Sequence, residues 1–323
     1  MAFEVSTTTD AIEPTASATT TPSVLCVAFS PDGTRVASGS SDGTVKVWRT
    51  NAERLGVCEM TFEPGAAVNS VTWSPDSPLR IVAAADTALY VYNTENASAE
   101  CERILRRVDD GGDSGATCQG HGSGAACQGH TGKVTCVTYS PDGKRIVSGS
   151  DDETVCVYNA ESGKCTMTLR GHADAVTSVA YSPDGKWFAS SSYDGSIRVY
   201  EGYSGKCVRI LRGNLTSVAF SPDGTCMIAG STEGFVRVWR TETDESVRVP
   251  FKNFRVVTSV TFFPDGERVA VGFDNTVCAV QIKNGYCQTL LTHSGSVTSV
   301  AISSDGKRVA TASCDGVLIA EVV

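Results

Sequence analysis

Three sets of histidine, hydroxyl and aspartate side chains recur in register along this chain of 323 residues. Histidine, serine and aspartate together can perform nucleophilic catalysis, in which the imidazole is the base and the carboxylate orients it. Neither serine of these sets, Ser148 or Ser190, lies in the G-x-S-x-G sequence that presents a nucleophile on a sharp turn. The recurrence therefore favours a structural role over a hydrolase site. The sets are His130, Ser148 and Asp152; His172, Ser190 and Asp194; and His293, Thr311 and Asp315.

Cysteine and histidine side chains also gather in a glycine-rich segment, where the sequence C-Q-G-H occurs twice. Two cysteines and two histidines could bind a tetrahedral zinc ion. The short Cys-x-x-Cys spacing of ordinary zinc modules is missing, and one of the histidines already belongs to a set above. We therefore interpret the segment as a duplicated Gly-His turn and expect neither a metal nor another cofactor. The alternative zinc ligands are Cys118, His121, Cys127 and His130.

These residues belong to a repeat that runs through the chain. The sequence Ser-Pro-Asp-Gly, or a close variant, occurs seven times. Five of the six intervals between occurrences are close to 41 residues, and the second interval is about 25 residues longer. A period of this length is typical of repeat architectures. The second residue of each occurrence is Pro31, Pro75, Pro141, Pro183, Pro222, Pro264 or Ser304.

Each unit contains the same order of short alternating runs and turns. In one unit, residues 176–181 alternate between apolar and polar types and end at a Pro-Asp-Gly turn. Further alternating runs follow at residues 187–190, 196–200 and 207–211, and turn sequences separate them. Alternation with period two predicts strands, and Pro and Gly supply the dihedral angles that tight turns need. Each unit is therefore expected to form four antiparallel strands.

On these seven registered units, the chain resembles the WD-repeat β-propeller family over about residues 23–323. The resemblance implies an all-β fold, a seven-bladed propeller of four-stranded antiparallel blades. The Trp-Asp dipeptide of the family is missing, and its Trp position holds Trp48, Tyr92, Tyr158, Tyr200, Trp239, Val280 and Glu321. The expected repeats cover residues 23–64, 65–131, 132–173, 174–212, 213–253, 254–294 and 295–323.

The resemblance also implies a hydrogen-bonded tetrad within a blade. In it, the histidine contacts both the aspartate and the hydroxyl, and the hydroxyl accepts a bond from the aromatic residue. Tyr200 would complete the set of His172, and Tyr158 that of His130, whereas Glu321 stands at this position beside His293. Blades 1, 2, 5 and 6 have no histidine, so we expect them to depend more on apolar stacking.

Two segments fall outside the repeat. Residues 1–22 are rich in Thr, Ala and Pro, and the last unit ends after its third strand. By the resemblance, an N-terminal strand is expected to complete the last blade, formed by either residues 3–6 or residues 15–20. The extra residues of the second interval are expected to form an insertion near residues 101–127, between blades 2 and 3.

Strand direction assigns each turn to one of two rims. The turns that carry the aspartates of the sets lie on one rim, here the upper rim, and the Pro-Asp-Gly turns lie on the lower rim. The residues before the upper turns and those that begin the first strands should face a partner on the upper rim. Exposed aromatic side chains are favoured as binding hot spots. The candidate partner-binding residues are Tyr193, Phe273, Leu25 and Asp151.

Composition excludes several classes of protein and of binding partner. The 36 acidic and 27 basic residues give a formal net charge of −9, which argues against general affinity for nucleic acid or anionic membranes. No apolar stretch is long enough for a membrane helix, and the N-terminal residues do not resemble a secretory signal. The 13 cysteines are scattered and mostly follow blade register, so we expect reduced thiols in the cytoplasm or nucleus.

These observations predict a non-enzymatic scaffold that binds proteins or peptides. We expect the propeller to be monomeric within a larger complex. We expect it to bind neither a membrane nor, directly, nucleic acid. The alternatives are a nucleic-acid-associated complex subunit and a propeller enzyme with a channel site. The second alternative would need carboxylates or histidines that converge from several inner strands.

Overall fold

A computed structural model describes residues 22–50, 56–77, 79–95, 100–107, 129–243, 245–249 and 256–322. Within these ranges the regular secondary structure consists of β-strands alone, and no helix is present that could cross a membrane. The strands form seven antiparallel sheets, six with four strands and one with three. The predicted all-β, seven-bladed architecture is confirmed.

Each sheet, or blade, consists of strands that are consecutive in the sequence. Blade 1 contains β1 (Val24–Phe29), β2 (Arg35–Ser40), β3 (Val45–Arg49) and β4 (Cys58–Phe62). Blade 2 contains β5 (Val68–Trp73), β6 (Arg80–Ala85), β7 (Ala88–Asn93) and β8 (Cys101–Leu105). Blade 3 contains β9 (Val134–Tyr139), β10 (Arg145–Ser150), β11 (Val155–Asn159) and β12 (Cys165–Leu169). Blade 4 contains β13 (Val176–Tyr181), β14 (Trp187–Ser192), β15 (Ser196–Glu201) and β16 (Cys207–Arg212). Blade 5 contains β17 (Leu215–Phe220), β18 (Cys226–Ser231), β19 (Val236–Arg240) and β20 (Ser246–Arg248). Blade 6 contains β21 (Val257–Phe262), β22 (Arg268–Phe273), β23 (Thr276–Gln281) and β24 (Cys287–Thr292). Blade 7 contains β25 (Val297–Ile302), β26 (Arg308–Ser313) and β27 (Gly316–Glu321).

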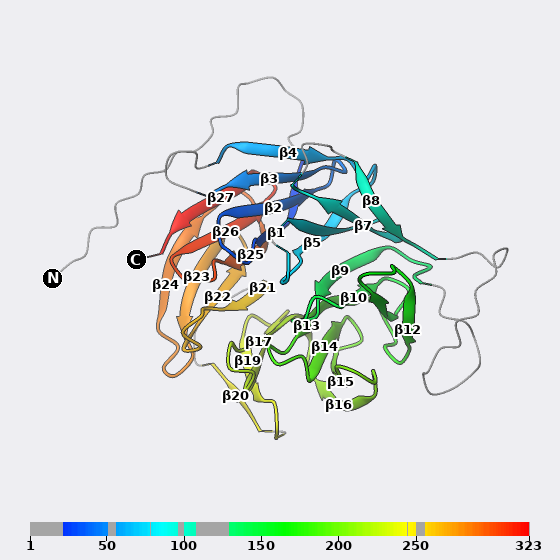
Figure 1. Cartoon of the computed structure of the whole chain (residues 1–323). Helices are drawn as coiled ribbons and strands as arrows, with labels where there is room; N and C mark the ends of the chain where they lie inside the picture. Colours follow the sequence, from blue (N-terminus) through cyan, green and yellow to red (C-terminus); the bar gives the residue numbers. More distant parts are fainter. Residues whose placement is uncertain are drawn as a thin grey trace.

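The seven blades close into a ring (Figure 1). The first strand of each blade is innermost and contacts the first strand of the next, from β1 through β5, β9, β13, β17 and β21 to β25. Strand β25 in turn contacts β1, which closes the circle. A lone sheet could not bury both of its faces, whereas the ring places each blade between two neighbours.

The Ser-Pro-Asp-Gly turns fix where each second strand begins. In blade 3, the Ser140 hydroxyl donates to Asp142 Oδ1 at 2.6 Å and accepts from the Arg145 N–H at 2.9 Å. The same Asp142 oxygen accepts from the Lys144 N–H at 3.1 Å. Gly143 has a φ of 68°, a conformation that glycine adopts without steric cost. The side chains therefore satisfy the turn backbone locally, and the strand register follows from the turn.

Neighbouring blades approach closely where the second strand carries a glycine. Gly149 on β10 lies against the fully buried Val176 on β13, and a Cβ added to Gly149 would lie 2.3 Å from Val176 Cγ1. The valine therefore occupies the space that a side chain on β10 would need. The same contact recurs between Gly39 and Val68 and between Gly230 and Val257.

The blades are also tied by hydrogen bonds between their innermost strands. A serine near the middle of one inner strand accepts a bond from a valine N–H in the next blade. The pairs, with oxygen-to-nitrogen distances of 3.2–3.3 Å, are Ser70 with Val137, Ser178 with Val218, Ser217 with Val260, Ser259 with Val300, and Ser299 with Val27. The last pair joins blade 7 to blade 1.

The segments predicted to lie outside the repeat are described only in part. Residues 101–105, at the start of the predicted insertion, form β8, so the extra residues follow Leu105. Residues 3–6 and 15–20, the two candidate closing strands, lie outside the described residues. So do three of the four alternative zinc ligands, Cys118, His121 and Cys127.

Candidate functional site

The histidine set of blade 4 forms a buried hydrogen-bonded chain. His172 Nδ1 lies 2.8 Å from Asp194 Oδ2, and its Nε2 lies 2.7 Å from Ser190 Oγ. Because an ionised carboxylate only accepts hydrogen bonds, Nδ1 donates to Asp194 and Nε2 accepts from the serine hydroxyl. Tyr200, 2% exposed, also hydrogen-bonds Ser190, and burial raises its pKa to about 12. Strand β14 supplies Ser190, β15 supplies Tyr200, the turn between them supplies Asp194, and the connection before β13 supplies the histidine.

Blade 3 repeats the first three members of this chain. His130 Nε2 lies 2.7 Å from Ser148 Oγ, and its Nδ1 lies 3.2 Å from Asp152 Oδ2. Tyr158 is buried in the same blade, which raises its pKa, but its interactions are with the Cys156 thiol and the His130 backbone. Both nitrogens of His130 are thus engaged within the blade, and no cluster of metal-binding side chains occurs among the described residues.

Blade 7 holds the third set. His293 Nδ1 lies 2.7 Å from Asp315 Oδ1, and Nε2 lies 2.7 Å from Thr311 Oγ1. Glu321, at the predicted aromatic position, is exposed at the end of β27. This blade therefore keeps the histidine, the hydroxyl and the carboxylate without an aromatic donor.

Blade 1 contains a related bond that the sequence interpretation missed. The Trp48 indole N–H donates to Ser38 Oγ at 2.8 Å, although the blade has no histidine. Ser38 occupies the same position on the second strand as Ser148 and Ser190, and this register could have revealed the bond. The blade therefore has a polar link in addition to apolar stacking.

Hydrogen bonds keep the aspartates of the sets ionised. Partial burial acts to raise the pKa of Asp194, but bonds from Ser196, His172 and Ala173 outweigh it and hold the pKa at about 2. The same balance holds the pKa of Asp315 at about 2. Burial lowers the pKa of His172, and the attraction of Asp194 opposes this only in part. At neutral pH the set is therefore a neutral imidazole bonded to a carboxylate.

The burial of the hydroxyls argues against a hydrolase site. Ser148, Ser190 and Thr311 are all 0% exposed, and the histidines are 6% exposed or less. A nucleophile must reach the substrate carbonyl, which these oxygens cannot do without opening the blade. The geometry instead satisfies polar groups that would be costly to bury unpaired. In blades 3, 4 and 7, the sets thus link the second strand, and the turn that leads to the third strand, to the connection that enters the blade.

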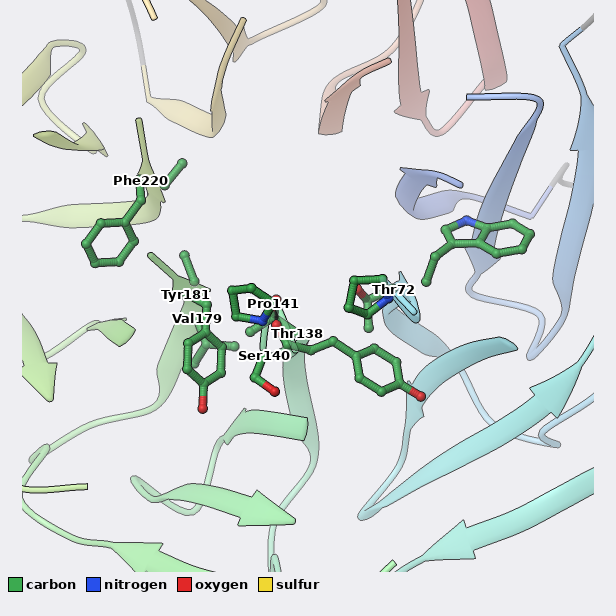
Figure 2. Close-up of a pocket in the computed structure, with 12 residues that line it drawn as sticks. Thr72, Thr138, Ser140, Pro141, Val179, Tyr181 and Phe220 are labelled. Carbon is green, nitrogen blue, oxygen red and sulfur yellow. Dashed lines mark hydrogen bonds between the residues drawn. The ribbon is translucent and has the colours of Figure 1, made fainter. Parts of the chain in front are cut away.

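A pocket of about 330 Å³ opens at the ends of inner strands from four successive blades, on the lower rim (Figure 2). Figure 2 shows Thr138, Pro141, Tyr181 and Phe220 among its lining residues. The lining contains aromatic rings, prolines and hydroxyls, but no histidine, cysteine or carboxylate. Burial raises the pKa of Tyr181 to about 12, so it stays protonated at neutral pH. The lining therefore offers no acid or base suited to catalysis near pH 7.

The four candidate partner-binding residues differ in exposure. Tyr193 is 66% exposed, and Asp151 is also exposed. Phe273 is half-buried and packs against the apolar cluster between blades 5 and 6, while Leu25 is half-buried on β1. The two exposed residues lie in corresponding turns of neighbouring blades 3 and 4. They are the members of the predicted set that a partner could contact without a rearrangement.

Polar residues at the start of the inner strands act between blades. Thr298 Oγ1 donates to the Val24 carbonyl of the next blade at 2.8 Å. Asn69 Nδ2 donates to the Val134 carbonyl at 2.8 Å. Both side chains extend from bulges between first and second strands and satisfy backbone carbonyls of the next blade. Their regular occurrence is therefore explained by the closure of the ring.

Acidic residues add a feature of the upper rim that the sequence interpretation did not identify. Asp86, Glu153 and Asp274 are exposed in the upper turns and have φ values of 48°, 67° and 43°. Non-glycine residues rarely adopt this left-handed conformation, which is strained and often found at functional sites. Glycine, at Gly195, has a similar φ of 76° in the upper turn of blade 4. The upper rim thus presents carboxylates at positions where glycine would adopt the backbone conformation with less strain.

A family model described as "WD domain, G-beta repeat" matches residues 13–49, 56–93, 115–159, 163–201, 205–240, 248–279 and 285–319. These seven matches cover most of the chain. Matches such as 56–93, 163–201 and 205–240 contain the fourth strand of one blade and the first three strands of the next, so the sequence repeat is offset by one strand from the blades. The chain belongs to the WD-repeat family. The family resemblance inferred from the repeat is confirmed, and propellers of this family are generally non-enzymatic and mediate protein interactions.

Similarity to individual relatives covers only part of the chain. The mouse (Mus musculus) "Ribosome biogenesis protein BOP1" is 41% identical over 71 residues, 22% of this chain and 9% of the relative. The human (Homo sapiens) "Angio-associated migratory cell protein" is 28% identical over 141 residues, 44% of this chain and 26% of the relative. The zebrafish (Danio rerio) "WD repeat-containing protein 18" is 28% identical over 135 residues, 42% of this chain and 28% of the relative. The chain thus spans a small part of each of these relatives.

Proposed function

We propose that this WD-repeat protein is a scaffold that holds protein or peptide partners on its upper rim. The exposure of Tyr193 carries the proposal, because two-thirds of this large aromatic side chain contacts solvent. A tyrosine at an interface buries a large apolar area while its hydroxyl keeps a polar contact. The rigid ring beneath it, with the buried histidine sets, holds the turn in place.

Charges around Tyr193 indicate the chemistry of the partner. Asp151 and Glu153 are exposed in the turn of the preceding blade, and Asp174 is exposed beside the start of β13. Carboxylates around an exposed aromatic ring favour a segment with lysine or arginine residues. We therefore propose a basic peptide or protein surface as the partner, recognised by Tyr193 and steered by the carboxylates.

Affinity purification with quantitative mass spectrometry tests this proposal. Tagged wild-type protein is compared with Tyr193→Ala and with Tyr286→Ala, a control at a turn on the lower rim that is 62% exposed. Tyr193→Ala should reduce the yield of specific partners by about tenfold, the effect of a modest hot spot. Partners that survive Tyr193→Ala, or that both substitutions remove equally, would contradict the proposal.

The same preparations separate the alternatives. Binding to a basic partner should weaken as salt rises and should also weaken in Asp151→Asn. A nucleic-acid-associated subunit would instead shift RNA or DNA in gels in a salt-dependent manner. The net charge of −9 favours the protein partner. A cytoplasmic or nuclear location and a monomeric propeller within a larger complex remain parts of the proposal.

A further inference from the structure

Cysteines occupy a repeated position at the outer edge of the propeller. Within the described residues, the fourth strands of five blades begin with cysteine: Cys58, Cys101, Cys165, Cys207 and Cys287. In blade 3 a second cysteine, Cys156, lies on the neighbouring strand β11. In blade 6, Cys278 takes the comparable place on β23. The two pairs therefore place thiols on adjacent strands of one sheet.

A β-bulge turns the two thiols of blade 3 toward the same hydroxyl. In the register of β11 and β12, Cys156 pairs with Thr168 and Tyr158 pairs with Cys165, and an extra residue lies between these two pairs. Thr168 Oγ1 lies 3.7 Å from Cys156 Sγ and 3.8 Å from Cys165 Sγ. Both cysteines belong to one apolar cluster. The sulfurs are thus neighbours on one face of the sheet.

The surroundings give the two thiols different characters. Cys156 is fully buried, and its sulfur lies 3.7 Å from His130 Nδ1. Cys165 is half-buried, so it is the more exposed of the two residues. The Cys156 thiol hydrogen-bonds the Cys165 sulfur, and this bond, with others from Thr168 and the Gly129 backbone, lowers the pKa of Cys165 to about 7. Cys165 is therefore suited to react first and Cys156 to follow.

We propose that Cys156 and Cys165 are a site of reversible oxidation that forms a disulfide between β11 and β12 when the protein meets a hydroperoxide. The Cys165 thiolate attacks one peroxide oxygen, the O–O bond breaks, and the hydroxide that leaves takes up a proton to become water. Cys165 is then a sulfenic acid. The Cys156 sulfur attacks the Cys165 sulfur, the S–O bond breaks, and the hydroxide departs as water with the Cys156 proton. Two thiols lose two electrons, and one hydrogen peroxide becomes two waters.

Blade 6 provides an internal control for this chemistry. There the bulge lies outside the pair, because Cys278 opposite Thr289 and Val280 opposite Cys287 are separated by one regular pair. Partial desolvation of its sulfur and a hydrogen bond with Cys278 raise the pKa of Cys287 to about 12. Its thiol is therefore protonated near neutral pH, although Cys287 is exposed. We therefore expect the two pairs to differ in reactivity because of the pKa of the outer thiol and the position of the bulge, and not because of solvent access.

Peptide mapping under non-reducing conditions tests the site. The reduced full-length protein is treated with hydrogen peroxide near neutral pH, quenched over a time course and digested for mass spectrometry. The 156–165 disulfide should form at least about tenfold faster than the 278–287 disulfide, because only Cys165 carries a large thiolate fraction. Dithiothreitol should reverse it. In Cys156→Ser, a sulfenic-acid probe should label Cys165, which then has no second thiol.

Matched variants keep the result interpretable. Cys165→Ser should abolish the cross-link, and Cys58→Ser, in the comparable place of blade 1, should leave it unchanged, because Lys46 there replaces the second cysteine. Circular dichroism of each variant checks that the blade still folds. The proposal is overturned if Cys165 stays a free, alkylatable thiol under peroxide. It is also overturned if the blade 6 pair reacts as fast, or if Cys165 ends as a mixture of higher oxides without the cross-link.

Discussion

Asp194 offers a direct test of how much a histidine set stabilises its blade. Its two carboxylate oxygens accept four hydrogen bonds, from His172 Nδ1, the Ala173 N–H, and the N–H and hydroxyl of Ser196. The substitution Asp194→Asn keeps one oxygen but places an amide NH₂ against either pair of donors. Because the side chain is 11% exposed, water cannot readily replace the lost acceptor.

The pKa of Asp194 gives the expected magnitude. The native structure lowers this pKa from 3.8 to about 2. Each pKa unit corresponds to about 1.4 kcal/mol, so the ionised form contributes about 2 kcal/mol to the free energy of unfolding. A lowered carboxyl pKa stabilises the fold above pH 3.8, and the contribution is lost as the pH falls toward 2. At pH 3 about half should remain.

Urea denaturation at pH 7 and pH 3 measures both effects. Asp194→Asn should lower the free energy of unfolding by about 2 kcal/mol at pH 7 and by about 1 kcal/mol at pH 3. The control Asp184→Asn removes the same charge from the lower turn of the same blade, where the side chain is 45% exposed. It should cost less than about 1 kcal/mol. Equal losses for the two variants at pH 7, or a loss at Asp194 that does not change with pH, would refute the reasoning.

Two further tests concern a close contact between turns and a hydrogen bond between strands. Gly202→Ala should destabilise the protein by about 2–3 kcal/mol or prevent folding, because its Cβ would lie 2.0 Å from the backbone oxygen of Gly185. In thermal unfolding, Gly65→Ala, which meets no atom within 4 Å, should cost only the strain of a left-handed residue, about 1 kcal/mol. Trp48→Phe should cost about 1 kcal/mol by removing the indole donor to Ser38. In a double-mutant cycle, Ser38→Ala should add little to that loss, and full additivity would show that the bond contributes nothing.

The blades themselves could be predicted from local sequence. A Ser-Pro-Asp-Gly turn satisfies its own backbone within five residues, as the bonds of Ser140 and Asp142 show. Strand boundaries therefore follow from the turns, and alternation between the turns indicates which face is apolar. Residues 101–105 are the exception, since a strand that precedes a long insertion has no turn sequence to mark its end.

The candidate site was predictable only in part. The spacing of His172, Ser190 and Asp194 could be recognised, because three blades repeat it. Sequence alone placed Phe273 and Tyr193 in the same role. Only packing shows that the Phe273 ring lies against the apolar cluster between blades 5 and 6 and that the Tyr193 ring faces solvent. The pairing of Cys156 with Cys165 depends on a bulge that moves one thiol beside the other.

The sequence by itself determined the number of units, the order of strands within each unit and the buried polar sets, because these depend on residues close together in the chain. The tertiary structure decided which glycines pack against a valine of the next blade, which turn side chains face solvent and which thiol has a lowered pKa. Those properties arise from contacts between strands and between neighbouring blades, such as Gly230 with Val257. Their geometry exists only once the ring has closed.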